Sequence, residues 1–389
     1  MRFMEQIYLD HAATSLLHPA ALDAMLPYFA EDFGNPSSTH HYGRVARQGL
    51  TEARKTIAAY LQATEHEVLF TSGGTEANNL ALIGYARANK EKGTHIITTE
   101  IEHHAVLHTL DQLKSEGFLV TKLKVNEEGL VSTEDVRSAL TDKTIIVSVM
   151  YGNNEVGVVQ PIEEIGEVLL GHQAVFHTDA VQAAGLLSLD VEALNVDMMS
   201  VASHKLNGPK GVGCLYVRDG LKLSPLLFGG EQERKRRAGT ENVPGAVGFA
   251  KALSIANENR EQRISDYMRY REIFHSIMKR HDIRVSENGS EVLRLPHILN
   301  VCFEGIHTDQ LLMKLDLLGI AASGGSACTA GAHVPSHVIN AMYGSGSKQL
   351  QEAVRFSFGI SNTEDEVRRA FEQIALSVKD ESERSEFIV

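Results

Sequence analysis

Residues 67–99 read EVLFTSGGTEANNLALIGYARANKEKGTHIITT and contain a strand–helix–strand unit. Glu67–Thr71 is a short apolar run typical of a buried strand, and a Gly-Gly turn follows it. The spacing then predicts a helix from Thr75 to about residue 92, and His95–Thr98 is a second β-branched run. Strand–helix–strand units of this kind are typical of a mostly parallel sheet, because parallel strands need a long crossover connection.

The same alternation continues to about residue 217. Amphipathic helical stretches separate further strand candidates, which are Val120–Val125, Thr144–Met150, Val175–Thr178, Met198–Val201 and Val212–Val217. A repeated pattern of this kind predicts an α/β fold with a mostly parallel sheet that helices cover on both faces.

The pattern changes after about residue 245. Helix-rich sequence runs to about residue 280, and strand candidates His297–Phe303 and Val354–Phe358 flank a helix at Thr308–Leu318. A chain of 389 residues is too long for one core, so we expect a second, smaller α+β domain here. The expected boundaries are residues 16–256 for the large domain, and residues 1–15 with 257–389 for the small one.

The composition excludes several classes of function. The chain has 37 Lys and Arg against 50 Asp and Glu, a formal charge of −13, which argues against generic binding to nucleic acid or to a membrane surface. The N-terminus lacks the apolar segment of a signal peptide, and no apolar run is long enough to span a bilayer. We therefore expect a cytoplasmic chain.

The cysteines and histidines form no metal or disulfide pattern. Cys214, Cys302 and Cys328 are far apart without a CxxC pair, and the first two lie in apolar runs as small core residues. His104 and His108 stand four residues apart, but no acidic or thiol ligand completes a site nearby, so we expect no metal. Cys328 differs, because it lies within SGGSACTAGA at residues 323–332, where nothing bulky surrounds it.

Three polar motifs follow predicted strands. TSGGTE at residues 71–76 offers a helix N-terminus to a phosphate, although most Gly-Gly turns are only turns. HTDAVQ at 177–182 puts Asp179 at a strand end, where it faces a ligand crevice or caps a helix. SHKLNGPKGVG at 203–213 puts Lys205 directly after an apolar strand, where desolvation would favour a nucleophilic amine; Lys210 lies inside the turn.

Together these motifs supply the three attachments that pyridoxal phosphate needs. Its phosphate requires an anchor, its ring nitrogen requires a carboxylate, and its aldehyde requires a lysine amine. His103, at another strand-to-helix junction, is suited to stacking on the ring.

The motifs FGNPSS, TSGGTEANN, EHHAV, NNEVG, HTDAVQ, SHKLNGPKG, RRAGTENV, GSACTAG and VRFSFG occur in this order along nearly the whole chain. In this the chain resembles the cysteine desulfurases of the NifS/IscS type, which are class V aminotransferase-like enzymes of pyridoxal-phosphate fold type I. The resemblance implies a homodimer that converts L-cysteine to L-alanine. It further implies a persulfide on Cys328, carried by a mobile loop at about residues 323–335. The sulfur would pass to an acceptor in iron–sulfur cluster assembly or tRNA thiolation.

The resemblance also assigns roles to single residues. Lys205 would form the Schiff base and move the α-proton, with Cys328 as nucleophile and His103 stacking on the ring. The remaining cofactor contacts would be Asp179, Gln182, Gly74, Thr75, His204, Asn154 and, from a second subunit, Thr240. Arg355 would bind the substrate carboxylate, with Asn154 and Asn35 beside the substrate.

One position departs from the family pattern, and two rival functions stay open. Many relatives have a phosphate-binding serine where this chain has Ala202, and the neighbouring Ser203 is a candidate replacement. Another fold type I enzyme, such as a selenocysteine lyase or an aminotransferase, would share Lys205 and Asp179 but would not need GSACTAG. A nucleotide-binding or scaffold protein would need neither cofactor nor lysine.

Overall fold

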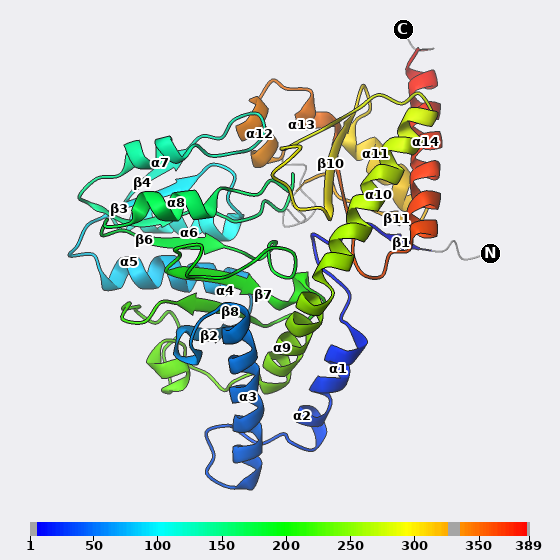
Figure 1. Cartoon of the computed structure of the whole chain (residues 1–389). Helices are drawn as coiled ribbons and strands as arrows, with labels where there is room; N and C mark the ends of the chain where they lie inside the picture. Colours follow the sequence, from blue (N-terminus) through cyan, green and yellow to red (C-terminus); the bar gives the residue numbers. More distant parts are fainter. Residues whose placement is uncertain (1–5, 326–334, 387–389) are drawn as a thin grey trace.

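The structure is a computed structural model that describes residues 6–325 and 335–386. Side chains of its last helix are described as far as residue 380. Within these residues the chain forms a large seven-stranded sheet, a three-stranded sheet and a two-stranded pair. Figure 1 shows the large sheet and its helices on one side, with the two smaller sheets and the helices α10, α11 and α14 on the other.

The large sheet has the order β2-β8-β7-β6-β5-β3-β4. Its strands are β2 (Val68–Thr71), β3 (His95–Thr99), β4 (Leu119–Leu123), β5 (Thr144–Ser148), β6 (Val175–Asp179), β7 (Met198–Ala202) and β8 (Gly213–Val217). β4, β3, β5, β6 and β7 pair in parallel, whereas β8 runs antiparallel to both β7 and β2. The prediction of a mostly parallel sheet is therefore confirmed. The antiparallel direction of β8 was not part of that prediction.

Helices cover both faces of this sheet. One core cluster includes residues of α3 (His41–Tyr60), α7 (Thr133–Ala139), α8 (Ile162–Leu169) and α9 (Val243–Glu258). The other includes residues of α4 (Gly74–Asn79), α5 (Tyr85–Ala88) and α6 (His104–Ser115). Because helices pack on both sides, every residue of β3, β5, β6, β7 and β8 is buried, including the polar ones near the strand ends such as His177 and Asp179.

The helix predicted from Thr75 to about residue 92 is interrupted. A π-helical turn, Leu80–Gly84, lies between α4 and α5, and α5 ends at Ala88. At the end of this turn, the carbonyl of Gly84 accepts a hydrogen bond from Ser224 N at 2.9 Å. A Cβ on Gly84 would lie 2.9 Å from Ser224 O, so the glycine permits this close approach of a distant segment.

The second part of the chain packs around a small antiparallel sheet of order β12-β10-β9. Its strands are β9 (Val285–Glu287), β10 (Ile298–Phe303) and β12 (Ala353–Ser357), and α10 (Arg260–Arg280), α11 (Thr308–Leu317) and α14 (Glu364–Glu386) add to its core. β1 (Ile7–Tyr8) pairs in parallel with β11 (Ile320–Ala321), which joins the N-terminus to this part. The boundaries expected at residues 15–16 and 256–257 stay predictions.

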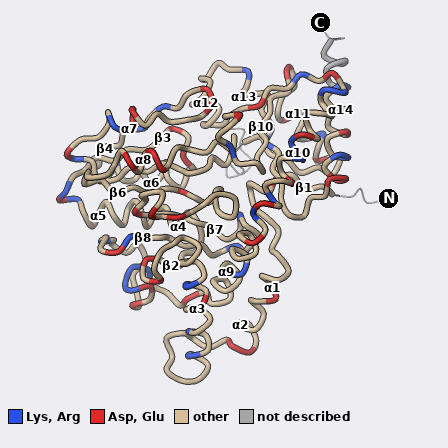
Figure 2. Tube along the Cα trace, in the orientation of Figure 1, with Lys and Arg blue, Asp and Glu red and all other residues tan. Residues whose placement is uncertain are grey.

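Shorter elements connect these layers. They are α1 (Pro19–Met25), α2 (Pro27–Ala30), α12 (His337–Tyr343) and α13 (Gln349–Glu352), with 3-10 turns at Glu65–Glu67, Ser203–Lys205 and Gln232–Lys235. Figure 2 shows charges of both signs spread over the helices and loops around the large sheet. Across residues 6–325 and 335–386, no helix is both long and apolar enough to cross a membrane.

Candidate functional site

A cavity of about 180 Å³ opens where several strands of the large sheet end. His103, Met150, Asp179 and Ala202 line it, and they stand at or just after the carboxyl ends of β3, β5, β6 and β7. Ligands of α/β proteins bind at this edge of the sheet. The cavity brings together nine of the predicted site residues, namely Gly74, Thr75, His103, Asn154, Asp179, Gln182, His204, Lys205 and Arg355.

Four predicted residues are not part of this cavity. Cys328, with the loop expected to be mobile around it, lies outside the described residues. Asn35 and Thr240 are exposed elsewhere on the chain. Ser203 is fully buried, and its Oγ has no hydrogen-bond partner among the described residues. Ala202, not Ser203, lines the cavity, because successive residues at a strand end point to opposite faces.

Lys205 is the amine of the cavity, and backbone carbonyls hold it. Its Nζ donates hydrogen bonds to the carbonyl oxygens of Ala12, at 2.5 Å, and Ala13, at 2.7 Å. The Ala12 oxygen also accepts a hydrogen bond from Gln182 Nε2 at 2.9 Å. The N-terminal segment DHAAT thus reaches the centre of the site, which the sequence did not indicate. Lys210, the rival lysine, is exposed and does not line the cavity.

Asp179 is fixed by two donors. Asn78 Nδ2 donates to its Oδ2 at 2.6 Å, and Val181 N donates to its Oδ1 at 3.0 Å. Asn78 itself is buried and lines the cavity, and its Oδ1 has no partner among the described residues. Asn78 belongs to the quoted motif TSGGTEANN, yet its role was missed, because its partner lies 101 residues further along the chain.

The start of α4 provides a cradle for an anion. Gly73 has φ +151°, a value that favours glycine, and Gly74 and Thr75 then open a helical run to Ala88. A Cβ on Gly74 would lie 2.8 Å from Val181 Cγ2, so the turn packs closely against the Val181 side chain. His204 faces the same cavity, and burial, then the charges of Lys205 and Lys210, lower its pKa to about 4. It is therefore a neutral hydrogen-bonding group at neutral pH.

Arg355 places a buried cation in the wall of the cavity. Its Nη2 donates to Asp10 Oδ1 at 2.7 Å, and its Nη1 donates to the carbonyl of Asn154 at 2.7 Å. Its Nε is buried and has no acceptor among the described residues. Sequence reasoning missed Asp10, because the contact joins residues 345 positions apart.

His103 lines the cavity, and its neighbour in the sequence, Glu102, is buried. His103 caps α6, and its Nδ1 accepts a hydrogen bond from Ala105 N at 3.1 Å, which leaves the ring proton of a neutral His103 on Nε2. Glu102 is fully buried, and its Oε1 accepts hydrogen bonds from Thr99 Oγ1 at 2.7 Å and Met150 N at 2.9 Å. Burial, with a smaller contribution from the charge of Asp179, raises the pKa of Glu102 to about 8.

The other candidate sites of the sequence are structural or lack a complete ligand set. Cys214 and Cys302 are buried free thiols, and burial raises the pKa of Cys214 to about 12. The rings of His104 and His108 lie 5.1 Å apart. Among the described residues, no group of three or more His, Cys, Asp or Glu side chains is arranged to hold a metal ion.

Comparisons with known proteins agree with this geometry. Residues 7–370 match the family model described as Aminotransferase class-V. A Bacillus subtilis (strain 168) protein, provisionally named cysteine desulfurase IscS 1, is 54% identical over 97% of this chain and 99% of its own. Cysteine desulfurase IscS of Methanosarcina thermophila is 46% identical over 95% and 91%.

Solved structures also resemble this chain. A NifS-like protein superposes with a TM-score of 0.90 at 34% identity, covering 96% of this chain and all (100%) of that one. The structure named SspA in complex with cysteine superposes with a TM-score of 0.78 at 36% identity, over 90% and 98%. The fold class expected from the sequence is therefore confirmed.

Proposed function

The chain belongs to the class V aminotransferase family, and from this premise we propose that it is a pyridoxal-phosphate-dependent cysteine desulfurase. It converts L-cysteine to L-alanine and holds the sulfur as a persulfide on Cys328. The observation that carries the proposal is the convergence of an amine, an acid and an anion cradle in one cavity, Lys205, Asp179 and Thr75. Near-full-length relatives named as cysteine desulfurases support the choice of reaction.

The residues present fit the cofactor. Thr75, Gly74 and the neutral His204 offer donors suited to a phosphate. The carboxylate of Asp179, held by Asn78 and Val181, is suited to a protonated ring nitrogen. The buried Oδ1 of Asn78 is an unused acceptor in the same wall. Ala202 supplies no hydroxyl to the phosphate, so this chain depends on the remaining anchors.

When bound, pyridoxal phosphate supplies a protonated ring that takes up electrons from the substrate Cα. Lys205 binds the cofactor and then serves as the base that moves the Cα proton. The carbonyls of Ala12 and Ala13 orient its Nζ, so the amine has a defined position whenever it is released. Gln182, which donates to the Ala12 carbonyl, and His103, at the start of α6, would hold the ring.

Arg355 is the group suited to the substrate carboxylate. Asp10 and the Asn154 carbonyl fix its guanidinium. Its Nε, which has no acceptor among the described residues, remains available as a donor. Once the substrate is bound, the thiolate of Cys328 attacks its sulfur. An S–S bond forms as the substrate C–S bond breaks, and the carbon fragment keeps the electron pair, is protonated and leaves as L-alanine. The persulfide sulfur then passes to a thiol acceptor in iron–sulfur cluster assembly or tRNA thiolation.

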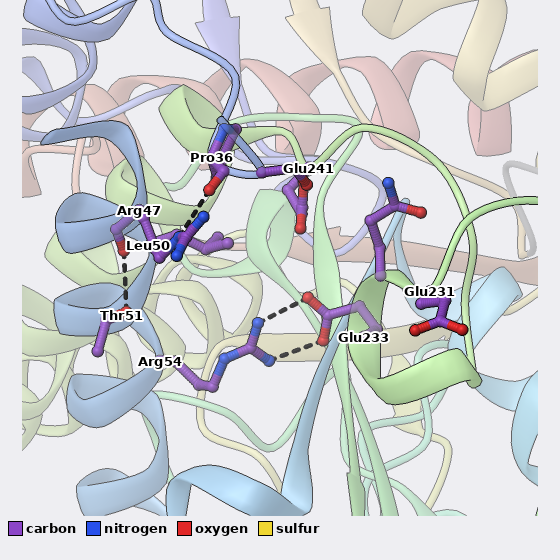
Figure 3. A pocket seen from close by; sticks show the side chains of 10 residues that line it. Pro36, Arg47, Leu50, Thr51, Arg54, Glu231, Glu233 and Glu241 are labelled. Atoms are coloured by element: carbon purple, nitrogen blue, oxygen red, sulfur yellow. Dashed lines mark hydrogen bonds and ion pairs between the residues drawn. The ribbon is translucent and has the colours of Figure 1, made fainter. Parts of the chain in front are cut away.

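We further propose that two copies of the chain complete each other's sites. Pro36, which follows Asn35, and Glu241, which follows Thr240, line a pocket of about 380 Å³ at the surface. Figure 3 shows Pro36 and Glu241 side by side in it, above the ion pair of Arg54 with Glu233. Two segments far apart in sequence are thus presented together, away from their own chain's cavity.

Exposed apolar side chains adjoin one of these segments. Phe33 is 65% exposed and lies 5.5 Å, ring to ring, from the half-exposed Tyr42, while Phe29 on α2 is 61% exposed. Exposed aromatic groups of this kind mark interaction surfaces. A second copy seated here would receive Asn35 and Thr240. Mixing Lys205→Ala chains with Thr240→Ala chains would then restore one intact site per mixed dimer, or about a quarter of wild-type activity; no recovery on mixing would argue against a shared site.

The function is tested with Cys328→Ala. The variant should bind pyridoxal phosphate normally, should release no alanine from cysteine, and should retain no sulfur label on the protein. Cys302→Ala is the matched control, because Cys302 is buried in β10 away from the cavity and should leave both activities intact. Undiminished alanine release by Cys328→Ala would refute the desulfurase proposal and favour another fold type I reaction.

Borohydride reduction should attach the cofactor to Lys205, and failure to do so would favour a non-catalytic protein.

A further inference from the structure

A second cavity, of about 320 Å³, lies where α9 meets α10 and where the chain leaves β12. It shares no lining residue with the cavity that holds Lys205. The lining residues that matter here are His18, Gln262, Arg263, Asp266 and Tyr267. The cavity is therefore a separate site in position and in chemistry.

Arg263 is buried in the wall of this cavity without a counter-charge. It is 8% exposed, and its Nε is enclosed without an acceptor. No ion pair or hydrogen bond of its guanidinium occurs among residues 6–325 and 335–380. The other buried arginines differ, because Arg271 binds Glu287 and the Ile298 carbonyl, and Arg355 binds Asp10.

An unpaired buried cation is costly, because it loses hydration and gains no compensating charge. Burial accordingly lowers the pKa of Arg263 from its ordinary value, and a smaller contribution from the neighbouring Tyr267 acts against this shift. A cost of this kind is removed when an anion enters the cavity, because the guanidinium then gains both a charge partner and an acceptor. An anion bound in the cavity would therefore compensate for the burial of Arg263.

The groups around Arg263 suit an anion. His18 Nδ1 accepts a hydrogen bond from Ala20 N at 3.1 Å, so a neutral His18 carries its proton on Nε2 and is a donor there. Asp266 is the one carboxylate among the described lining residues, and Gln262 Nε2 already donates to its Oδ1 at 2.8 Å. Asp266 does not pair with Arg263, so the guanidinium is left for an incoming group.

We propose that this cavity binds a small oxyanion, a phosphate or a carboxylate, whose charge Arg263 neutralises. The proposal is independent of the desulfurase reaction, since no residue of that site takes part. It places the ligand at the junction of the large sheet's last covering helix and the small sheet, beside the loop Gly359–Asn362. The ligand chemistry is that of a singly or doubly charged oxyanion that accepts hydrogen bonds from a guanidinium and an imidazole.

The test uses the chain saturated with pyridoxal phosphate, so that the phosphate cradle of the first cavity is filled. Calorimetric titrations with inorganic phosphate and, separately, with acetate are compared at constant ionic strength set by sodium chloride. The variant is Arg263→Gln, and the control is Arg260→Gln, which makes the same charge change three residues earlier on α10 outside the cavity. Wild type and Arg260→Gln should bind one oxyanion per chain, and Arg263→Gln should lose at least about tenfold in affinity.

Thermal unfolding gives a second readout. In oxyanion-free buffer Arg263→Gln should melt no lower than wild type, because the substitution removes an unpaired buried charge. Millimolar phosphate or acetate should raise the melting temperature of wild type and not that of Arg263→Gln. Tighter binding of phosphate than of acetate would indicate a phosphate-bearing ligand, and tighter binding of acetate would indicate a carboxylate. Absence of saturable binding of either anion to wild type, or equal binding to Arg263→Gln, would overturn the proposal.

Discussion

Substitution of Asn78 tests whether cofactor binding requires the Asp179 carboxylate to be held in a fixed position. Asn78→Ala removes the donor that lies 2.6 Å from Asp179 Oδ2 and leaves Val181 N as the remaining donor to that side chain. A buried hydrogen bond to a charged group contributes about 1.5–3 kcal/mol. If that stabilisation serves the cofactor-bound state, the dissociation constant of pyridoxal phosphate should rise by about tenfold to a hundredfold.

The assay is equilibrium dialysis of pyridoxal phosphate, with the absorption spectrum of the bound cofactor as an independent readout. Asn78→Asp provides a sharper version, because it places a second carboxyl against Asp179. Two carboxylates at such a distance cannot both stay ionised without strong repulsion. Cofactor retention by Asn78→Asp should therefore fall as the pH rises, while wild type should hold its cofactor over the same range.

Asn79→Ala is the matched control. Asn79 is the adjacent residue, and its Nδ2 donates to the Thr75 carbonyl at 2.9 Å on the exposed side of α4. The same truncation there should leave cofactor affinity within about twofold of wild type. Equal affinities for wild type and Asn78→Ala, with unchanged spectra, would refute the idea that Asn78 organises Asp179. Equal losses in both asparagine variants would point instead to a general weakening of α4.

Two further predictions concern stability. Burial raises the pKa of Glu102 from 4.5 to about 8, so the folded state keeps a proton that the unfolded state releases, and the free energy of unfolding falls as the pH rises across this window. Glu102→Gln should flatten that dependence by up to about 1.4 kcal/mol per pH unit in urea titrations, and an unchanged slope would contradict the assignment. Glu233→Gln breaks the buried pair with Arg54, whose nitrogens lie 2.6 and 2.7 Å from the carboxylate, and should cost about 3 kcal/mol of unfolding free energy. A melting temperature equal to that of wild type would show that the pair contributes nothing.

The strands were predictable from sequence because burial on both faces gives each of them a short continuous run of mostly apolar and β-branched residues. The predicted runs at residues 67–71, 95–98 and 175–178 differ from β2, β3 and β6 by one residue at one end. The convergence of Thr75, Asp179 and Lys205 was also predictable, because each lies at or just after the end of a strand and the topology brings strand ends to one edge. The antiparallel direction of β8 has no such local signal.

The missed residues share a physical reason. Asn78 and Asp10 acquire their roles only through partners that the fold brings to them, Asp179 and Arg355. A polar residue in a helix or near a terminus is indistinguishable, by local pattern, from a solvated one. Ser203 illustrates the converse, because a plausible residue type one position from the required face is turned into the core.

The contact between Asp10 and Arg355 has a consequence for biosynthesis. Ala12 and Ala13 supply the carbonyls that hold Lys205, yet their neighbour Asp10 meets its partner on β12 only after residue 355 has been synthesised. The large sheet, complete at Val217, can assemble earlier on the growing chain. A nascent chain stalled before residue 355 would therefore carry Lys205 without a finished pocket around it.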